Sequence, residues 1–588
     1  MTELKLDANF AQASQADWLA AVETALKGKS AETLVSTDLA GFARQPLYNE
    51  ANSTTAQDEA GLPGFAPFTR GARAVNNKFL PWHIAQRAVI GRANADNAAI
   101  RADLEGGVSA ITLDFSDKTA DADALDKLLD GVMLDIAPLN LVTDKRGMDA
   151  IQPVLALFDK RGLDADAIGF LNADPLAAFV QYGESDDIDF TALAGLATTR
   201  PGLCLMTSSG AAYHAMGASV PQELGWMLAG LVAYIGALEA AGMDAADALS
   251  KITLTVAADV DFFATLAKIR TARLLFANIA KAIGAADMRP QIHAETSLRA
   301  FSDVDPWVNI LRATAASMGA GIAGVDLMTV APCTASSATD NQLTRRIARN
   351  TQIILQEESH IGQVTDAAGG SWYVEQLTRD LADAAWAEFQ AIEAAGGLQA
   401  AIADGSIAAA LQAQTQAYQG AVDKRAMPLV GVSEFPNIDE APLDAAPNAV
   451  GYRHAQGFEA LRHAAQKAKP KVFMACIGEM ADFTPRANFA TNLYNAGGLS
   501  AVLGDGGTDA AAIADAFKKS TAKIAVICGS DADYDTHADA VAAALTDAGA
   551  THIALAGKPR ENAQIDDYCF AGCAALSYLT AIHAKLGL

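Results

Sequence analysis

The 588-residue sequence is poor in cysteine and basic residues, and it has no long uncharged apolar run. Lys and Arg number 43 against 69 Asp and Glu, a formal net charge of −26, so binding to nucleic acid or to an anionic membrane surface is not expected. The most apolar uncharged run, residues 224–238, is shorter than a membrane-spanning helix and is predicted to be a buried helix. The N-terminus has the pattern of neither a signal peptide nor a transit peptide. A soluble, cytoplasmic protein is therefore expected.

Common catalytic and cofactor motifs are also missing. The sequence contains no GxSxG, GxxxxGK[ST] or HExxH, so serine-hydrolase, P-loop and zinc-protease sites are not indicated. One GxGxxG, at 319–324, precedes a predicted strand, whereas a dinucleotide loop follows one, which favours a helix end or close backbone packing. Gly504–Gly507 follows a predicted strand, but the acids beside it make it a poor phosphate cradle. The six cysteines are scattered, and all are expected to be buried thiols.

From about residue 79 to 375, short β-branched runs alternate with long amphipathic stretches, a pattern typical of parallel βα units. An eighth strand could lie near Lys78–Ile84. About 300 residues with eight such units favour a (β/α)8 TIM barrel over an open sheet. The other predicted strands are Ala110–Phe115, Asn140–Thr143, Ile168–Leu171, Leu203–Thr207, Lys251–Ala257, Pro290–Glu295 and Gly324–Thr329.

The regions on either side of this barrel have different patterns. A short helix is predicted over Gln15–Leu26, and because so short a helix is marginal alone, it must pack on its own chain or on a partner. Residues 379–425 are predicted to be helical, and Asn437–Asn448 to be a linker. A second α/β unit follows, typical of a flavodoxin-like doubly wound sheet. Its predicted strands are Lys471–Ile477, Ser500–Leu503, Lys523–Cys528 and His552–Ala556.

The predicted domain organisation has four parts. Residues 1–50 form an N-terminal arm, and residues 51–378 form the barrel. Residues 379–468 form a helical region with a linker, and residues 469–588 form the second α/β domain.

Three polar residues near the ends of predicted barrel strands are candidates for chemistry. His293, Asp114 and Asp259 lie toward the carboxyl ends of their strands, the face that carries the site in barrel enzymes. The carboxylates could be general bases or could bind a polar group of a ligand. Equally, they could cap the helices that follow. From the residues alone, no complete catalytic or metal site emerges.

Several segments resemble the methylmalonyl-CoA mutase family, in order and spacing, over about residues 45–588. The family pairs a (β/α)8 barrel that binds acyl-CoA with a C-terminal flavodoxin-like cobalamin domain. The resemblance therefore implies the architecture predicted above, and a radical interconversion of methylmalonyl-CoA and succinyl-CoA that uses adenosylcobalamin. The segments are Pro46–Tyr48, Gly61–Gly71, Pro81–Gln86, Asp103–Gly107 and the block Asp303–Glu375, especially Asn341–Gln356 and Asp366–Glu375.

The cobalamin loop departs from the family pattern. Cobalamin-binding members carry Asp-x-His-x-x-Gly after the first strand of this domain, where the His coordinates cobalt and the Asp orients it. Here the three positions hold Met480, Asp482 and Pro485. Since no nearby His replaces the ligand, the resemblance implies that lower-axial ligation is lost. Part of the surface that receives the nucleotide tail, near Cys528–Ser530, could survive as scaffold.

The barrel departs from the family pattern as well. The family's Tyr-His pair places its His at Ala212, with His214 as the alternative if the loop shifts by two residues. The Tyr that shields the cofactor face is Arg87 here, and the Arg before Pro-Trp that helps hold CoA is Leu80. The Arg expected after the third barrel strand is Tyr182. A CoA diphosphate would thus meet few cations.

These departures resemble the small subunit of heterodimeric mutases, which keeps the fold without a working site. The resemblance implies no catalytic, cofactor-binding or metal-ligating residue in this chain, and adenosylcobalamin bound in a partner. That partner is a large catalytic subunit contacted by the N-terminal arm, and a mutase-associated G-protein chaperone is a further candidate partner. The alternatives are an autonomous acyl-CoA mutase that holds cobalamin without His, and a regulatory module that binds the G protein.

Overall fold

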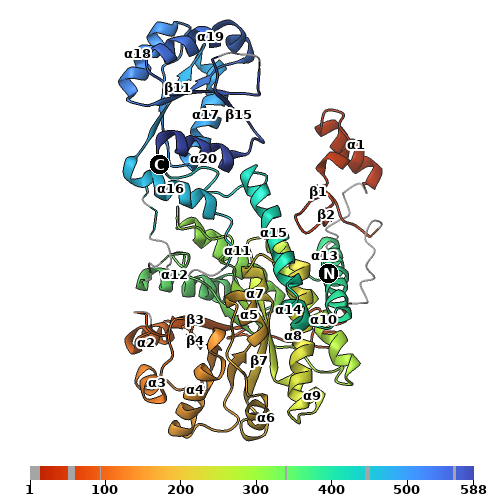
Figure 1. The fold of residues 1–588 in the computed structure, drawn as a ribbon. Coiled ribbons are helices and arrows are strands. Elements are labelled where there is room, and N and C mark those ends of the chain that lie inside the picture. Colours follow the sequence, from red (N-terminus) through yellow and green to blue (C-terminus); the bar gives the residue numbers. More distant parts are fainter. Residues whose placement is uncertain are drawn as a thin grey trace, which may run out of the picture.

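The computed structural model describes residues 13–50, 60–92, 95–337, 339, 341–440, 442–443, 451–560 and 564–588. A helix-covered barrel lies at the bottom of Figure 1 and a smaller α/β domain at the top, with helices α15 (Ser406–Asp423) and α16 (Gln456–Ala468) between them. The predicted linker Asn437–Asn448 is described only at 437–440 and 442–443, and its remaining residues lie outside the described part.

Eight parallel strands close into a barrel in the order β10-β3-β4-β5-β6-β7-β8-β9, which confirms the predicted (β/α)8 architecture. Closure occurs where Leu327 of β10 pairs with His83 of β3. The strands are β3 (His83–Val89), β4 (Ala110–Asp114), β5 (Leu139–Val142), β6 (Gly169–Ala173), β7 (Leu203–Ser209), β8 (Ile252–Ala258), β9 (Ile292–Thr296) and β10 (Leu327–Thr329).

Two barrel strands begin three or more residues later than the sequence indicates. The eighth strand, placed near Lys78–Ile84, is β3 and starts only at His83, because Pro81 has no N–H to donate to a neighbouring strand. The last strand, predicted from Gly324, starts at Leu327. Gly324 instead ends the preceding helix with a left-handed φ of 77°, a conformation that glycine adopts without strain.

Helices surround the barrel, and the GxGxxG segment lies in one of them. Gly319 and Gly321 are inside α11, where added side chains would meet the Phe262 carbonyl and the Trp82 ring, so close packing explains both glycines. The helices are α2 (Asn97–Glu105), α3 (Ala122–Leu128), α4 (Gly147–Arg161), α5 (Pro175–Tyr182), α6 (Phe190–Thr199), α7 (Gly210–Ala215), α8 (Val220–Ala240), α9 (Ala245–Ser250), α10 (Phe262–Ala282), α11 (Val308–Ala323) and α12 (Gln342–Ile353) with its π-helical end Ile354–Glu358.

Helix α8 is the apolar run singled out in the sequence. It is long and apolar enough to cross a membrane by length and composition, but 67% of its most apolar window is buried inside the protein. It packs against α13 (Trp372–Ala394), against α10 and against strand β7. The short helix α14 (Leu398–Ala403) and α15 follow α13 and continue the helical region predicted for 379–425.

The C-terminal domain is a five-stranded parallel sheet in the order β12-β11-β13-β14-β15, the flavodoxin-like arrangement. Four strands match the prediction, but the three-residue edge strand β15 was missed because Asp-Tyr-Cys contains no β-branched residue. The strands are β11 (Lys471–Cys476), β12 (Ser500–Leu503), β13 (Ile524–Cys528), β14 (His552–Ala556) and β15 (Asp567–Cys569), and the helices are α17 (Met480–Ala496), α18 (Ala510–Ser520), α19 (Asp531–Asp547) and α20 (Ala575–Leu586). All six thiols are free, but Cys573 is only half-buried.

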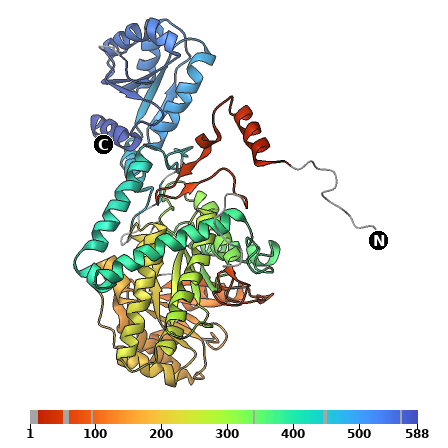
Figure 2. The ribbon, with the colours of Figure 1, turned by 90° about the vertical axis from the view of Figure 1, so that its right-hand side faces the viewer.

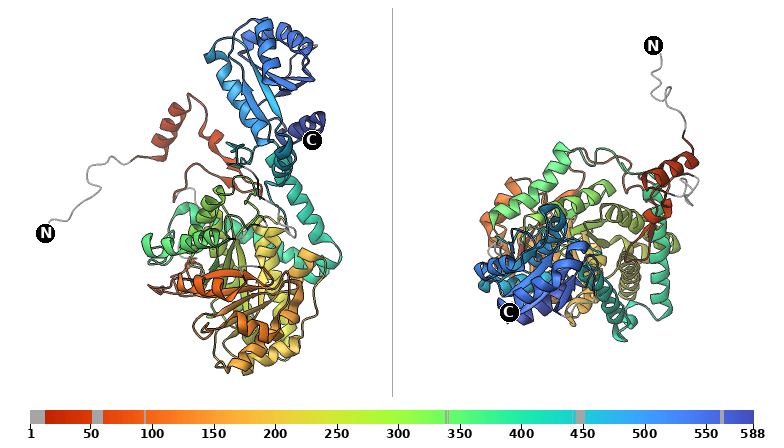
Figure 3. Two further views of the ribbon diagram at one scale, coloured as in Figure 1. Left: turned by 90° about the vertical axis from the view of Figure 1, so that its left-hand side faces the viewer. Right: turned by 90° about the horizontal axis from the view of Figure 1, so that it is seen from above.

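The N-terminal arm has an attached part and a projecting part. Residues 36–44 form the hairpin β1 (Ser36–Thr37) and β2 (Ala43–Arg44), and Arg44 of this hairpin pairs with Asp261 of the barrel. Before the hairpin comes a short 3₁₀ turn, Ala31–Leu34. Helix α1 (Gln15–Ala25) extends away from both domains in Figures 2 and 3 and has no buried residue.

Candidate functional site

The barrel interior is lined by small polar side chains, whereas bulky branched residues usually fill a TIM barrel. Asn140 of β5 donates to the Thr112 hydroxyl (3.1 Å), and Asn172 of β6 donates to Asn140 (2.8 Å). Thr253 of β8 donates to Asn172 (3.1 Å), so this chain of bonds crosses the barrel axis. A cavity of about 10 Å³ beside these residues holds no more than a water. At this level of the barrel the axis is therefore filled by the protein's own side chains.

The candidate His293 lies within β9 and is not at its carboxyl end. It is buried, and its Nε2 is 2.9 Å from the Thr329 hydroxyl of β10. Burial, with Arg87 also contributing, lowers the pKa of His293 to about 4, although Glu295 opposes the shift. The ring is therefore neutral near neutral pH and belongs to the polar lining of the barrel.

Arg87 occupies the carboxyl-end mouth of the barrel between two carboxylates. Its guanidinium is 3.3 Å from Asp114 at the end of β4 and 2.9 Å from Glu295 of β9. Arg345 of α12 donates to the Arg87 carbonyl at 2.8 Å and so fixes the backbone there. The cation is satisfied by its own chain. Asp114 was a candidate from the sequence, but Glu295 was missed because only barrel closure brings β9 near β3.

A third carboxylate at the mouth, Asp144, bonds to the Tyr182 hydroxyl. Burial and the nearby Asp114 raise the pKa of Asp144 to about 6, although Tyr182 and Arg87 oppose the shift. Asp144 also has a left-handed φ of 54°, uncommon for a residue other than glycine. The structure thus groups Arg87, Tyr182 and Asp114, three of the residues singled out in the sequence, at one end of the barrel.

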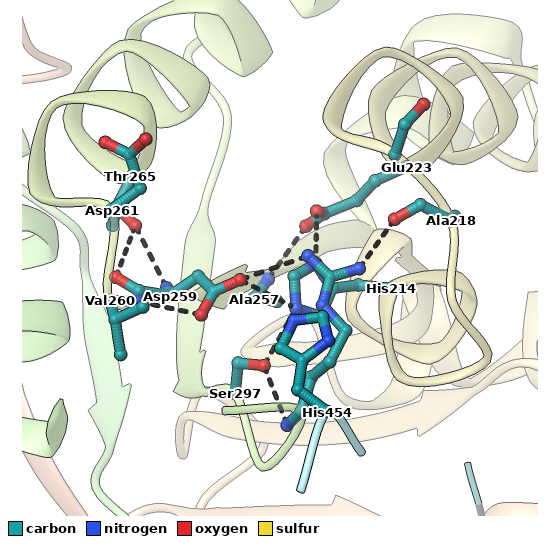
Figure 4. A network of polar contacts seen from close by, with 12 residues as sticks. His214, Ala218, Glu223, Ala257, Asp259, Val260, Asp261, Thr265, Ser297 and His454 are labelled. Atoms are coloured by element: carbon teal, nitrogen blue, oxygen red, sulfur yellow. Dashed lines mark hydrogen bonds and ion pairs between the residues drawn. The ribbon is translucent and has the colours of Figure 1, made fainter. Parts of the chain in front are cut away.

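His214 lies in a separate buried network beside the mouth (Figure 4). Its Nδ1 is 3.0 Å from Glu223 of α8, and its Nε2 is 2.8 Å from the Ser297 hydroxyl and 3.5 Å from Asp259. Lys268 of α10 is 2.5 Å from the same Glu223 carboxylate. Both ring nitrogens of His214 therefore have protein partners, and the side chain is 1% exposed.

The charges of this network balance without a proton on His214. Burial opposes the ionisation of Glu223, but Lys268 and His214 outweigh it and lower the pKa of Glu223 to about 2. Burial and the nearby Arg299 lower the pKa of His214 to about 4. Arg299 in turn pairs with Asp259 at 3.0 Å. Two carboxylates thus face two permanent cations, and the imidazole between them stays neutral.

Neither carboxylate candidate from the sequence caps the helix that follows its strand. Asp261 is the residue that caps α10, while Asp259 accepts the Arg299 guanidinium. Asp114 accepts the Ser116 N–H at 2.8 Å and pairs with Arg87, and Asp121 caps the next helix. Their ionic partners lie on other elements: Arg87 is on β3, the strand beside β4, and Arg299 is in the loop after β9.

Ala212 and Leu80 do not join the mouth cluster. Ala212 is buried in α7, and Leu80 precedes β3 at the opposite, amino-terminal end of the barrel. Arginines of the loop before Leu80 are already paired: Arg73 is 2.9 Å from Asp326, and Arg70 is 2.8 Å from Asp366.

In the C-terminal domain, the loop after β11 is built into the start of helix α17. Asp482 accepts the Glu479 N–H at 3.3 Å as part of a capping box, and Pro485 lies inside the helix. Met480 is 74% exposed. The loop from 477 to 485 contains no imidazole. Among the described residues, no group of three or more His, Cys, Asp or Glu side chains could hold a metal ion.

Backbone bonds join two loops at the carboxyl edge of this sheet, where doubly wound sheets usually bind ligands. Gly478 donates to the Gly507 carbonyl (3.0 Å), and Gly507 donates to the Gly478 carbonyl (2.9 Å). Gly507 belongs to the Gly504–Gly507 segment, which therefore pairs with the loop after β11. Near Cys528–Ser530, Gly529 donates its N–H to the buried Tyr534 hydroxyl (3.0 Å), and Ser530 caps α19.

The segments that carry the family resemblance meet in the fold. Arg349 of α12 is 3.2 Å from Asp103 in the Asp103–Gly107 segment. Arg270 of α10 is 2.6 Å from Glu375 and also pairs with Asp366. These buried ion pairs tie the Asp366–Glu375 segment to the barrel wall.

The sequence was compared with protein families and with known proteins, and the matches name the family that the segments above resemble. The methylmalonyl-CoA mutase family model matches residues 37–124 and 118–511. A methylmalonyl-CoA mutase small subunit of Streptomyces virginiae is 39% identical over 100% of this chain and 98% of its own length. That of Propionibacterium freudenreichii subsp. shermanii is 32% identical, with 95% and 91% covered. A methylmalonyl-CoA mutase of Cereibacter sphaeroides is 30% identical, with 82% and 72% covered. The chain therefore belongs to the methylmalonyl-CoA mutase family.

Proposed function

We propose that the chain is the non-catalytic small subunit of a heterodimeric, adenosylcobalamin-dependent methylmalonyl-CoA mutase. The large subunit carries out the interconversion of methylmalonyl-CoA and succinyl-CoA, and this chain supplies scaffold and interface in the cytoplasm. The observation that carries the proposal is the mouth of the barrel, where Arg87 is held by Asp114 and Glu295. Because two carboxylates of its own chain already hold this guanidinium, it is not free to bind an anionic group of an acyl-CoA.

The residues present do not fit cobalamin as the family binds it. The position expected to hold the cobalt ligand is Asp482, whose carboxylate takes part in the cap of α17. The loop has no imidazole, and its Gly478 is bonded to Gly507 of the loop that follows the neighbouring strand β12. We therefore assign adenosylcobalamin to the partner subunit and no step of the reaction to this chain.

The N-terminal arm supplies the partner contact in this proposal. The hairpin is fixed to the barrel through Arg44 and Asp261, and Phe42 packs beside Leu377 and Leu381 of α13. Helix α1 has no buried residue, although an isolated helix of this length is marginal in water. A helix presented on an anchored stalk suits binding to another subunit, and burial of Trp18 and Leu19 there would stabilise it.

Coexpression with the large subunit tests this function. The two chains should copurify at a 1:1 ratio, and mutase turnover should survive Arg87→Met in this chain but not loss of the large subunit's own site. Removal of residues 1–28 should weaken the complex, while the truncated chain keeps its circular dichroism spectrum. Turnover by this chain alone, or loss of turnover with Arg87→Met in an intact heterodimer, would show that its barrel is catalytic.

A further inference from the structure

The barrel and the C-terminal domain share a buried seam. The loop after β9 inserts Val304 into the hydrophobic core cluster that also holds Phe458 and Leu461 of α16. The preceding residue, Asp303, donates its backbone N–H to the Glu459 carboxylate at 2.9 Å. Helix α16 thus contacts the barrel at this seam and connects the C-terminal domain to it.

The seam contains more negative than permanent positive charge. Asp303 (2% exposed) and Glu459 (4%) are both buried, and Arg453, which is 2.5 Å from Glu459, is the arginine paired with this couple. His463 of α16 is 3.1 Å from the Asp303 carboxylate and 32% exposed, so it reaches solvent. Arg453 therefore pairs with Glu459, while the ion-pair partner of the Asp303 carboxylate among the described residues is His463.

The Asp303 carboxylate is poorly accommodated in its ionised form. Its Oδ1 has no hydrogen-bond partner among the described residues, although the atom is buried. Burial and the neighbouring Glu459 raise the pKa of Asp303 to about 6, while His463 and Arg453 oppose the shift. The docked state therefore holds a proton more readily than a solvated aspartate does.

Other charged groups lie around the same seam. Arg462 donates to the Asn437 carbonyl at 2.7 Å and faces Asp305 and Glu440 as well as Asp303. Just before α16, the backbone N–H of His454 bonds to the Arg299 carbonyl at 2.9 Å. Burial and Arg299 lower the pKa of His454 to about 3, so acid acts on His454 in the opposite sense to Asp303.

We propose that Asp303 and His463 form a proton-operated latch between the barrel and helix α16. A proton on the Asp303 carboxyl closes the seam and holds the C-terminal domain on the barrel. Loss of that proton leaves a buried, ionised carboxylate in the seam. Helix α16 then separates from the barrel more often. The latch makes the position of the C-terminal domain sensitive to mild acidification, independently of any catalytic role.

Hydrogen exchange of the full-length chain tests the latch. Protection of the peptide that spans residues 456–468 gives the opening constant of α16 at each pH, and Asp303→Asn supplies a neutral, permanently closed mimic. The ratio of the wild-type opening constant to that of D303N should rise by up to about tenfold per pH unit from pH 5 to 6 and level off above about pH 6.5. His454 is common to both chains, so its contribution cancels in the ratio.

Two further variants keep the test decisive if D303N is less well folded. His463→Gln removes the group that favours ionised Asp303, so the rise in the opening constant should move to higher pH. His537→Gln, on α19 and away from the seam, should leave the wild-type profile unchanged. A ratio that stays flat with pH, or an H463Q profile that matches the wild type, would overturn the latch.

Discussion

The carboxyl edges of the barrel and of the C-terminal sheet are closed in different ways. At the barrel mouth the closing groups are side chains, with Arg87 between Asp114 and Glu295. At the edge of the C-terminal sheet the closing groups are backbone, with Gly478 and Gly507 bonded to each other. In most α/β proteins these are the edges where ligands bind.

The two edges differ in whether side-chain or backbone atoms make the contacts. An ion pair at the barrel mouth disappears when one side chain is replaced, and the polar lining below it stays in place. The glycine loops are joined by backbone hydrogen bonds, with φ of 88° at Gly478 and 107° at Gly507, and neither glycine is among the three departing positions Met480, Asp482 and Pro485.

Breaking the buried network beside the mouth should have the largest effect. Glu223→Gln leaves Lys268 without an anionic partner in the core, and loss of one partner of a buried ion pair costs about 3–5 kcal/mol of unfolding free energy. Glu239→Gln, exposed on the same helix, is the matched control and should change stability by less than about 0.5 kcal/mol. Urea denaturation measures both, and equal stabilities would show that the network contributes nothing.

The pH dependence of His454 should be the next largest effect. Because the pKa of His454 is lowered to about 3 in the folded chain, the unfolded chain binds more protons below about pH 6.5. The advantage of the wild type over His454→Gln should therefore shrink as pH falls, by about 1.4 kcal/mol per pH unit. Denaturation at several pH values gives this difference, and a constant difference would contradict the assigned neutral ring.

Replacing the glycines of the joined loops should lower the free energy of unfolding by somewhat less than the two changes above. Gly478→Ala would place a Cβ 2.8 Å from the Asp533 carboxylate and hold alanine at positive φ, with a loss of about 2 kcal/mol expected. Gly507→Ala has the same kind of strain but nothing within 4 Å of its Cβ, so it should lose less. Thermal unfolding of the two variants compares them. If they are equally destabilised, the close approach of the Asp533 carboxylate to Gly478 adds no cost to the strain of positive φ.

The smallest effect is expected at the mouth itself. Arg87→Met leaves Asp114 and Glu295 without their shared counter-ion, and because Arg87 is partly exposed a loss of about 1–2 kcal/mol is expected. Arg101→Met breaks an exposed pair with Glu105 and should cost under about 0.5 kcal/mol. A larger loss for R101M than for R87M in denaturant unfolding would refute the role of Arg87 as the counter-ion of the mouth.

The sequence predicted the elements well where strands were β-branched and periodic, as in β8 with its Ile-Thr-Leu-Thr-Val run. It failed at β15, which has three residues and no such pattern. Among functional candidates, it drew attention to Arg87 and Asp114 but not to Glu295, whose partner lies across the closure of the barrel. Glu223 and Lys268 were missed because they are 45 positions apart in the sequence. The signal that could have found them is a charged residue on the buried face of an otherwise apolar helix.

The measurement that tests the central claim most directly is the number of corrinoids bound per heterodimer. The complex with the large subunit is purified, reconstituted with excess adenosylcobalamin, freed of unbound cofactor, and its corrinoid content is read by absorbance against protein concentration. One corrinoid per pair of chains is the result this account predicts. Two per pair would mean that this chain binds cobalamin despite Asp482 and the joined glycine loops, and would contradict the assignment of the cofactor to the partner.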